Sequence, residues 1–222
     1  RAPRAAPNVV LISIDTLRSD HLPAYGYDKV ATPAIDALRR DAILFERAYS
    51  HVPMTFPSHS SILTGVLPTK TGVRDNVGYE LHSRTLPYLP RLLHDQGYAT
   101  GGAVSAFVMR GEIGFSEGFD FYEDKIHSRT GRGLGGVQRP GAETLQLALP
   151  WLRGVAKRPF FFFLHLYEPH APYTPPEPYA SRYPFLYDGE IPAEPLVISE
   201  ALAERVERVR IGRVLTKTKA RV

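Results

Sequence analysis

The residues best suited to chemistry lie between Val52 and Gly65, where a turn should lead into a short helix. Pro57 suits the first helical position, and Gly65 suits the residue just beyond the helix end. Such a junction places the Thr55 hydroxyl beside free backbone N–H groups, where an anionic ester could be held while a hydroxyl attacks it. Threonine is also a common helix cap, so this segment alone leaves both interpretations open.

A second candidate is Asp15, which follows the apolar run from Asn8 to Ile14. A β-branched run without alternation predicts a central strand of a parallel sheet, buried on both faces. Asp15 would then lie at the carboxyl edge of the strands, where open α/β sheets build their sites. Aspartate also caps helices well, so its carboxylate could instead cap the element that follows.

Two histidines accompany a second buried run, Pro159 to Tyr167, which contains four consecutive phenylalanines. His165 lies near the end of this predicted strand, and His170 follows in a loop flanked by prolines. If the two strands are parallel, His170 shares an edge with Asp15. Histidine can donate to an anionic oxygen or act as a general acid. The alternative for a single histidine is a purely structural hydrogen bond.

The remaining pattern predicts how the chain positions these residues. Segments whose apolar residues recur at helical spacing, with capping and terminating residues at their ends, alternate with short apolar runs typical of strands. We therefore predict an α/β fold with a doubly wound, mainly parallel sheet and helices on both faces. A glycine-rich stretch, residues 125–140, is typical of a mobile loop. The predicted helices are Thr32–Ala42, Thr85–Gly97 and Ala142–Leu152, and the further strands are Ile43–Tyr49 and Tyr98–Ala106.

Composition excludes several classes of function. The chain has 222 residues and no cysteine, which excludes a disulfide frame, thiolate ligands and a thiol nucleophile. Residues 191–222 hold seven Lys/Arg and four Asp/Glu, so residues 1–190 are close to neutral and show no footprint for nucleic acid. No apolar run approaches the length of a membrane span, and the first seven residues lack the apolar core of a secretion signal.

Five segments resemble, in the same order, those of the sulfatases of the alkaline phosphatase superfamily. The resemblance covers about residues 8–190 and implies an incomplete alkaline-phosphatase-like fold. We therefore expect a linker at 1–7, an amino-terminal catalytic region at 8–190 and a divergent or truncated basic tail at 191–222. The five segments are Asp15–Gly26, Thr55–Gly65, Gly72–Asn76, Gly97–Thr100 and Pro169–Tyr173.

The resemblance implies roles for individual residues. Asp15 and Thr55 match the family's ligands to a divalent metal ion, which here could be Ca, Mn, Mg or Zn. Thr55 matches the nucleophile, and His170 matches the histidine that contacts the ester oxygens. The implied partner is a small anionic ester, and the family favours a periplasmic or other extracytoplasmic location. The candidate substrate-binding residues are Asn76, His59 and His165.

Departures from the family pattern decide which chemistry is expected. Sulfatases carry Cys or Ser at the position of Thr55, and a separate enzyme converts it to formylglycine, which is impossible for Thr. An unmodified Thr is similar to the phosphodiesterase and lipoteichoic-acid-synthase-like branches, so we expect a metal-dependent hydrolase or transferase and favour phosphoesters. The arginine that normally follows Pro-Ser is His59, and the strand that normally carries a lysine reads Gly101–Ser105.

Two alternatives stay open, namely a sulfatase that acts without formylglycine and a non-catalytic binding module with the same fold. Asp15 is followed by Thr16 rather than a second carboxylate, and the sequence has no Asp-His-Gly segment, which supplies further ligands in the family. We therefore expect this chain by itself to be weakly active or inactive.

Overall fold

The computed structural model describes residues 6–127, 137–171, 173 and 175–183. The chain divides into two compact units, one formed by residues 1–17 and 43–174 and the other by residues 18–42 and 175–222. The first unit contains the sheet and every candidate site residue. The predicted basic tail and most of the predicted glycine-rich loop lie outside the described residues.

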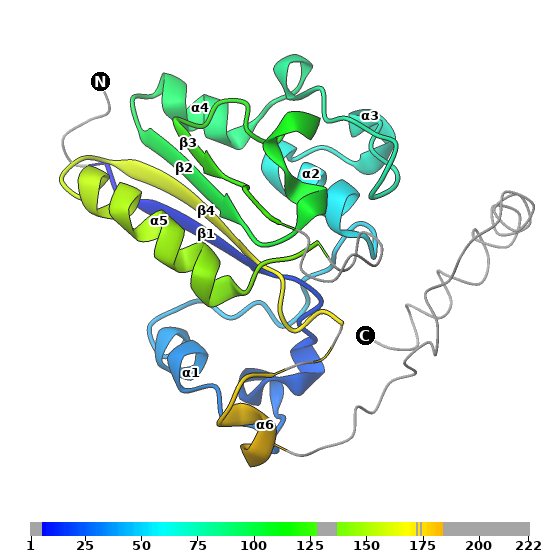
Figure 1. The fold of residues 1–222 in the computed structure, drawn as a ribbon, viewed down its shortest axis with the longest axis vertical. Helices are drawn as coiled ribbons and strands as arrows, with labels where there is room; N and C mark the ends of the chain where they lie inside the picture. Colours follow the sequence, from blue (N-terminus) through cyan, green and yellow to red (C-terminus); the bar gives the residue numbers. More distant parts are fainter. Residues whose placement is uncertain (1–5, 128–136, 172, 174, 184–222) are drawn as a thin grey trace, which may run out of the picture. The chain divides into compact units, whose positions relative to one another are not determined.

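The sheet of the first unit has four strands in the order β1-β4-β2-β3, and every pair of neighbours is parallel (Figure 1). This confirms the predicted α/β fold with a parallel sheet. The strand β3 is an addition that the sequence did not predict. The strands are β1 (Val9–Ile14), β2 (Ala99–Val104), β3 (Phe121–Glu123) and β4 (Phe160–Leu166).

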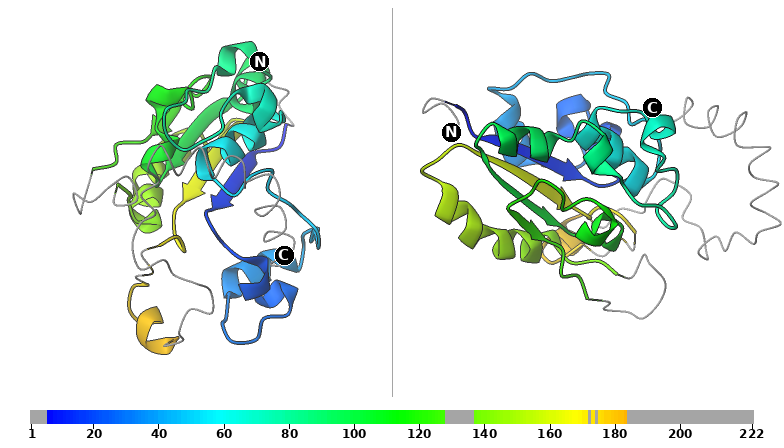
Figure 2. Two further views of the ribbon diagram at one scale, coloured as in Figure 1. Left: turned by 90° about the vertical axis from the view of Figure 1, so that its right-hand side faces the viewer. Right: turned by 90° about the horizontal axis from the view of Figure 1, so that it is seen from above.

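Helices cover both faces of this sheet (Figures 1 and 2). Successive side chains of a strand point to opposite faces. In β4, Phe161 and Phe163 therefore join the larger core beneath α2 (Thr55–Thr64) and α4 (Leu89–Asp95), while Phe162 and Leu164 pack with residues of α5 (Gly141–Val155). His165 continues the row of Phe161 and Phe163, which directs it toward α2.

The prediction for β1 is wrong in one respect. Among the described residues β1 pairs only with β4, so it is an edge strand rather than a central one. Its alternate residues Val9 and Leu11 pack on the larger core, whereas Val10 and Ile12 are each 53% exposed. An unbroken apolar run does not reveal whether one or both faces of the strand are covered, because the same sequence pattern is compatible with either arrangement.

Two predicted helices begin at residues other than those expected. The helix α2 begins earlier, at Thr55, so Pro57 is its third residue, and it ends as predicted at Gly65 in the left-handed conformation with φ 67°. The helix α4 begins at Leu89 instead of Thr85, because Leu86 precedes Pro87 and is extended, with φ −120° and ψ 156°. A residue before proline avoids the helical region.

The predicted strand Ile43–Tyr49 does not form. None of the described strands pairs with this segment, and Ile43 and Phe45 are 84% and 69% exposed. A short apolar run favours a strand only where a neighbouring strand can complete its hydrogen bonds. Here the apolar run alone was insufficient.

The other elements are short. The predicted helix Thr32–Ala42 is α1 (Pro33–Arg39) in the second unit, where it contacts a 3₁₀ turn and buries none of its residues fully. No helix in the described part of the chain is both long enough and apolar enough to span a bilayer. The rest are α3 (Pro68–Thr71), α6 (Tyr179–Arg182) and the 3₁₀ turns Ser19–His21, Pro23–Tyr25, Ser83–Thr85, Phe107–Met109 and Gly111–Ile113.

Candidate active site

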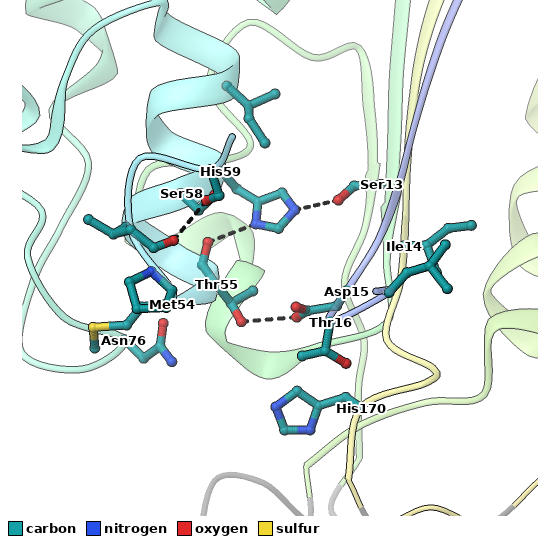
Figure 3. Close-up of a pocket in the computed structure, with 15 residues that line it drawn as sticks. Ser13, Ile14, Asp15, Thr16, Met54, Thr55, Ser58, His59, Asn76 and His170 are labelled. Atoms are coloured by element: carbon teal, nitrogen blue, oxygen red, sulfur yellow. Dashed lines mark hydrogen bonds between the residues drawn. The ribbon is translucent and has the colours of Figure 1, made fainter. Parts of the chain in front are cut away.

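Asp15 and Thr55 meet at the carboxyl edge of the sheet. Asp15 directly follows β1, and its backbone N–H donates to the carbonyl of Leu166, which extends the parallel pairing with β4. Thr55 is the first residue of α2, and its Oγ1 donates to Asp15 Oδ2 at 2.9 Å (Figure 3). Because Met54 rather than Thr55 is the N-cap residue, the Thr55 side chain does not cap this helix.

The Asp15 carboxylate is held in its charged form. Burial raises the pKa of Asp15, but the contacts with His165, Thr55 and His59 outweigh it, so that the pKa lies below its usual value. Among described residues Asp15 caps no helix, since the next element, the 3₁₀ turn after Arg18, has no side-chain cap. The strand-end carboxylate therefore faces the Thr55 hydroxyl as an anion.

His59 lies one turn after Thr55 on α2 and is only 4% exposed. Its Nδ1 is 2.7 Å from the Thr55 carbonyl oxygen, which can only accept, so Nδ1 carries the hydrogen. Burial, followed by repulsion from His165, lowers the pKa of His59 to about 4. The neutral ring therefore accepts at Nε2 from Ser13 Oγ, 2.7 Å away. With both nitrogens occupied by protein groups, His59 has none left for the substrate contact that the sequence suggested.

His165 is completely buried behind Asp15. Its Nε2 is 3.5 Å from Asp15 Oδ2, too long for a strong hydrogen bond, and neither ring nitrogen has a hydrogen-bond partner among the described residues. Its ring meets that of His59 edge to face, with centroids 4.9 Å apart. Such burial does not suit the predicted contact with a substrate, and the two unpartnered nitrogens mark a polar gap beside Asp15.

Asn76 supports the start of α2. Its Oδ1 accepts from the backbone N–H of Phe56 at 2.9 Å, which fixes the orientation of the amide because an N–H group needs an acceptor. The amide nitrogen is consequently the end turned away from the helix (Figure 3). This orientation gives Asn76 a donor group on the pocket side, as its predicted role toward an anionic ester requires.

His170 lies on the same edge of the sheet, as the parallel pairing of β1 and β4 requires. Its Nδ1 is 2.8 Å from the carbonyl oxygen of Ala171, so this nitrogen carries a hydrogen. Its Nε2 is 3.3 Å from Tyr167 Oη, and the two rings stack with centroids 4.3 Å apart. Glu168 anchors the same loop, since its carboxylate accepts from the Gly141 N–H at the start of α5.

These side chains surround one pocket of about 490 Å³ (Figure 3). Its polar side is formed by Asp15, Thr55, Asn76 and His170, and its lining contains neither lysine nor arginine. An anionic ester would therefore need positive charge from a bound cation or from protonated histidine. The apolar side is formed by Ile14, Leu17, Val52, Pro53, Met54 and Ile62.

The pocket fits one side of a divalent metal site. Asp15 and Thr55 bring a carboxylate and a hydroxyl oxygen together, and hard cations prefer oxygen ligands. The two nitrogens of the buried His165, close to Asp15, have no hydrogen-bond partner among the described residues. However, within the described ranges no group of three or more His, Cys, Asp or Glu is arranged to hold a metal ion. The described residues supply part of a ligand set.

Sequence reasoning missed three supporting residues. Ser13 interrupts the apolar run of β1 two positions before Asp15, and this polar residue in a buried strand was the available signal. Tyr167 and Glu168 lie directly between the predicted strand and His170, but nothing in their types showed that one stacks on the histidine and the other binds a helix N-terminus.

The sequence and the fold are similar to those of known proteins. The sequence profile described as Sulfatase matches residues 7–206. The structure is similar to a phosphonate monoester hydrolase of Agrobacterium radiobacter, with a TM-score of 0.63 and 24% identity over 80% of this chain and 44% of that one. It is also similar to an alkaline phosphatase superfamily protein from Vibrio parahaemolyticus, with a TM-score of 0.60 and 19% identity over 96% of this chain and 50% of that one. These likenesses show that the chain shares the α/β fold of both proteins.

The chain belongs to the sulfatase family. It is 26% identical over 209 residues to iduronate 2-sulfatase of Homo sapiens, an alignment that covers 81% of this chain and 38% of the human protein. The chain thus spans well under half the length of this relative.

Proposed function

We propose that this chain carries the nucleophile side of a metal-dependent site that cleaves or transfers an anionic ester, with Thr55 as the attacking group. One observation carries the proposal: the unmodified Thr55 hydroxyl donates to the strand-end carboxylate of Asp15 at 2.9 Å inside the pocket. A hydroxyl next to a group that accepts its hydrogen is the usual arrangement of an activated oxygen nucleophile.

In the first step the Thr55 oxygen forms a bond to phosphorus and the bond from phosphorus to the leaving alcohol breaks. The hydrogen of the Thr55 hydroxyl moves along its hydrogen bond to Asp15, and His170, when protonated at Nε2, gives a proton to the departing alkoxide. The products are the free alcohol and a phosphoryl ester of Thr55. The Asn76 amide donates to an oxygen of the group being transferred.

In the second step water, or another alcohol, attacks phosphorus, and the bond to the Thr55 oxygen breaks. His170 now takes the proton of the attacking molecule, and Thr55 recovers its hydrogen from Asp15. Water gives hydrolysis and an alcohol gives transfer, so one first step serves both outcomes. A divalent ion bound by Asp15 and Thr55 would lower the pKa of the hydroxyl and neutralise charge on the ester.

Phosphoesters are favoured because Thr55 cannot become formylglycine and must attack directly. The relatives name both ester classes, a sulfatase and a phosphonate monoester hydrolase. A sulfatase that uses unmodified threonine is therefore the second candidate function. We base a periplasmic or other extracytoplasmic location on family resemblance alone, and fractionation of the cells that make the protein would check it.

A non-catalytic binding module is the third candidate, and the incomplete ligand set among the described residues favours it over an enzyme in this chain taken alone. Calorimetric titration with Mn²⁺, Ca²⁺ and Zn²⁺ separates these cases when both this chain and its complete parent protein are tested. Tight binding by the parent supports an enzyme, whereas its absence from both proteins supports a binding module.

The decisive assay compares 4-nitrophenyl phosphate, bis(4-nitrophenyl) phosphate and 4-nitrophenyl sulfate in the parent protein, with and without a chelator. We expect turnover of a phosphate ester that the chelator abolishes. Thr55→Ala should lower kcat by roughly a thousandfold or more, since loss of a nucleophile is rarely compensated. Thr55→Ser keeps the hydroxyl and is the matched control. Equal activity in Thr55→Ala would exclude the mechanism, and preference for the sulfate ester would favour the second candidate.

A further inference from the structure

We infer that Ser13 and His59 are positioning residues, which form a brace between β1 and α2 that aligns the Thr55 hydroxyl with Asp15. The brace consists of two hydrogen bonds of 2.7 Å, from Ser13 Oγ to His59 Nε2 and from His59 Nδ1 to the Thr55 carbonyl oxygen. This inference rests on the proposed function of Thr55, and it adds roles that the family resemblance did not supply.

The brace acts at the right place because of the spacing of its residues. Ser13 and Asp15 are two positions apart at the end of β1, so their side chains leave the same face of the sheet. Thr55 and His59 are four positions apart on α2, so they lie on the same face of the helix. Strand and helix are therefore joined by two side-chain contacts, Asp15 with Thr55 and Ser13 with His59.

Two contacts constrain the helix more than one does. Core packing holds α2 as a whole, while the hydrogen bond between Thr55 and Asp15 and the contact one helical turn away set the orientation of its first turn against β1. The histidine also fixes the first residue of the helix directly, because it binds the carbonyl of Thr55 itself. Misplacement of a reacting group by about 1 Å can reduce a rate by roughly a hundredfold, so such a brace matters for the attack on the ester.

Both residues line the pocket, but their polar groups are engaged within the protein. His59 is 4% exposed and uses both ring nitrogens for protein contacts, and the hydrogen of the Ser13 hydroxyl is directed to His59, so neither offers a free hydrogen to the ester. Loss of the brace should consequently reduce kcat and leave KM close to its original value. A residue that contacts the ester would instead raise KM.

The kinetic test compares Ser13→Ala with Ser13→Thr in the parent protein, using whichever 4-nitrophenyl ester it turns over. Ser13→Ala removes the donor, and we expect kcat to fall by roughly 10- to 100-fold with KM within about twofold. Ser13→Thr retains a hydroxyl and should restore most of the activity. Unchanged kcat in Ser13→Ala, or a rise in KM alone, would overturn the inference.

A second variant tests whether Ser13 and His59 act as one unit. His59→Asn keeps a donor near the position of Nδ1 but cannot reach Ser13. If the two residues act together, kcat of the double variant Ser13→Ala/His59→Asn should be no lower than kcat of His59→Asn alone, because the effects of coupled residues are not additive. A double variant whose reduction in kcat equals the product of the two single reductions would contradict a shared role.

A spectroscopic readout keeps this inference separate from the proposed function, because it needs no activity. In this chain, labelled with ¹⁵N-histidine, a long-range proton–nitrogen correlation spectrum reports which ring nitrogen carries the hydrogen, and His59→Asn assigns the signals. We expect the hydrogen on Nδ1 of His59, and Ser13→Ala should shift the Nε2 signal toward that of a nitrogen without a donor. A hydrogen on Nε2, or no shift in Ser13→Ala, would refute the brace even if the enzyme is active.

Discussion

At the scale of single residues, Tyr167 determines how His170 faces the pocket. The tyrosine is almost fully buried, and burial, with a smaller contribution from Asp15, raises the pKa of Tyr167 to about 12. Its hydroxyl therefore stays protonated at neutral pH, and its oxygen can accept from Nε2 of His170 when that nitrogen carries a hydrogen. Because Nδ1 of the same ring donates to Ala171, the imidazole is oriented from both sides.

Tyr167→Phe tests this support, because it keeps the stacked ring and removes only the hydroxyl. We expect a loss of about 1 kcal/mol in the free energy of unfolding and a reduction of kcat in the ester assay, since His170 is less well oriented. Denaturant unfolding and steady-state kinetics measure the two effects.

Tyr88→Phe is the matched control for that prediction. Tyr88 is fully buried and donates to the carbonyl of Phe115 at 2.7 Å, but it does not line the pocket. Removal of the Tyr88 hydroxyl should lower the free energy of unfolding by an amount similar to or larger than that for Tyr167→Phe, and it should leave kcat unchanged. Equal losses of kcat in both variants would mean that Tyr167 acts only through stability.

Sequence reasoning reached residues that meet in the pocket but missed the contacts that support them. Asp15, Thr55, Asn76 and His170 were all predicted, and the structure brings them to one pocket. The contact of Ser13 with His59 depends on how α2 packs on β1, which cannot be read from either segment alone. The contact of Tyr167 with His170 depends on the conformation of the loop after β4.

At the scale of elements, the packing of α5 on the sheet depends on a glycine in β2. Trp151 of α5 stacks against Phe121 and Phe162, with ring centroids 5.5 and 5.8 Å away. A Cβ atom at Gly101 would lie 2.4 Å from the nearest atom of that indole ring. The small residue therefore provides the space in which the ring lies, at a strand where related sulfatases were expected to carry a lysine.

Gly101→Ala should consequently destabilise the first unit by about 1 to 3 kcal/mol, the usual cost of overpacking a core. Gly154→Ala is its control, because Gly154 lies in the same helix as Trp151 and a Cβ atom there meets nothing within 4 Å. Alanine at Gly154 should be neutral or stabilising, by up to about 1 kcal/mol. Thermal or denaturant unfolding distinguishes the two, and an unchanged stability in Gly101→Ala would contradict the close approach.

Element prediction succeeded where local signals and packing agree. The helix α2 ends at Gly65 in the left-handed conformation. Glycine adopts this conformation readily, so the residue type alone predicts the end of the helix. The segment Ile43–Tyr49 failed because a strand needs a neighbour, and none of the described strands pairs with it. The edge position of β1 was missed for the same reason, since pairing partners come from distant parts of the chain.

At the scale of the whole molecule, the described residues place the Thr55 hydroxyl and the Asp15 carboxylate together at the edge of a parallel sheet. The chain covers 38% of human iduronate 2-sulfatase and 44% of the phosphonate monoester hydrolase chain. The pocket, the brace and the histidine loop all belong to the first unit. This supports testing the nucleophile in the parent protein and the brace in this chain.

The most direct test of the central claim is to trap the ester on Thr55. The parent protein is mixed with bis(4-nitrophenyl) phosphate and a divalent ion, quenched with acid on the time scale of one turnover, digested and mapped by mass spectrometry. We predict a phosphoryl ester on Thr55 in the wild-type protein and none in Thr55→Ala. Release of 4-nitrophenol without any modification of Thr55, at a rate that Thr55→Ala retains, would contradict the account.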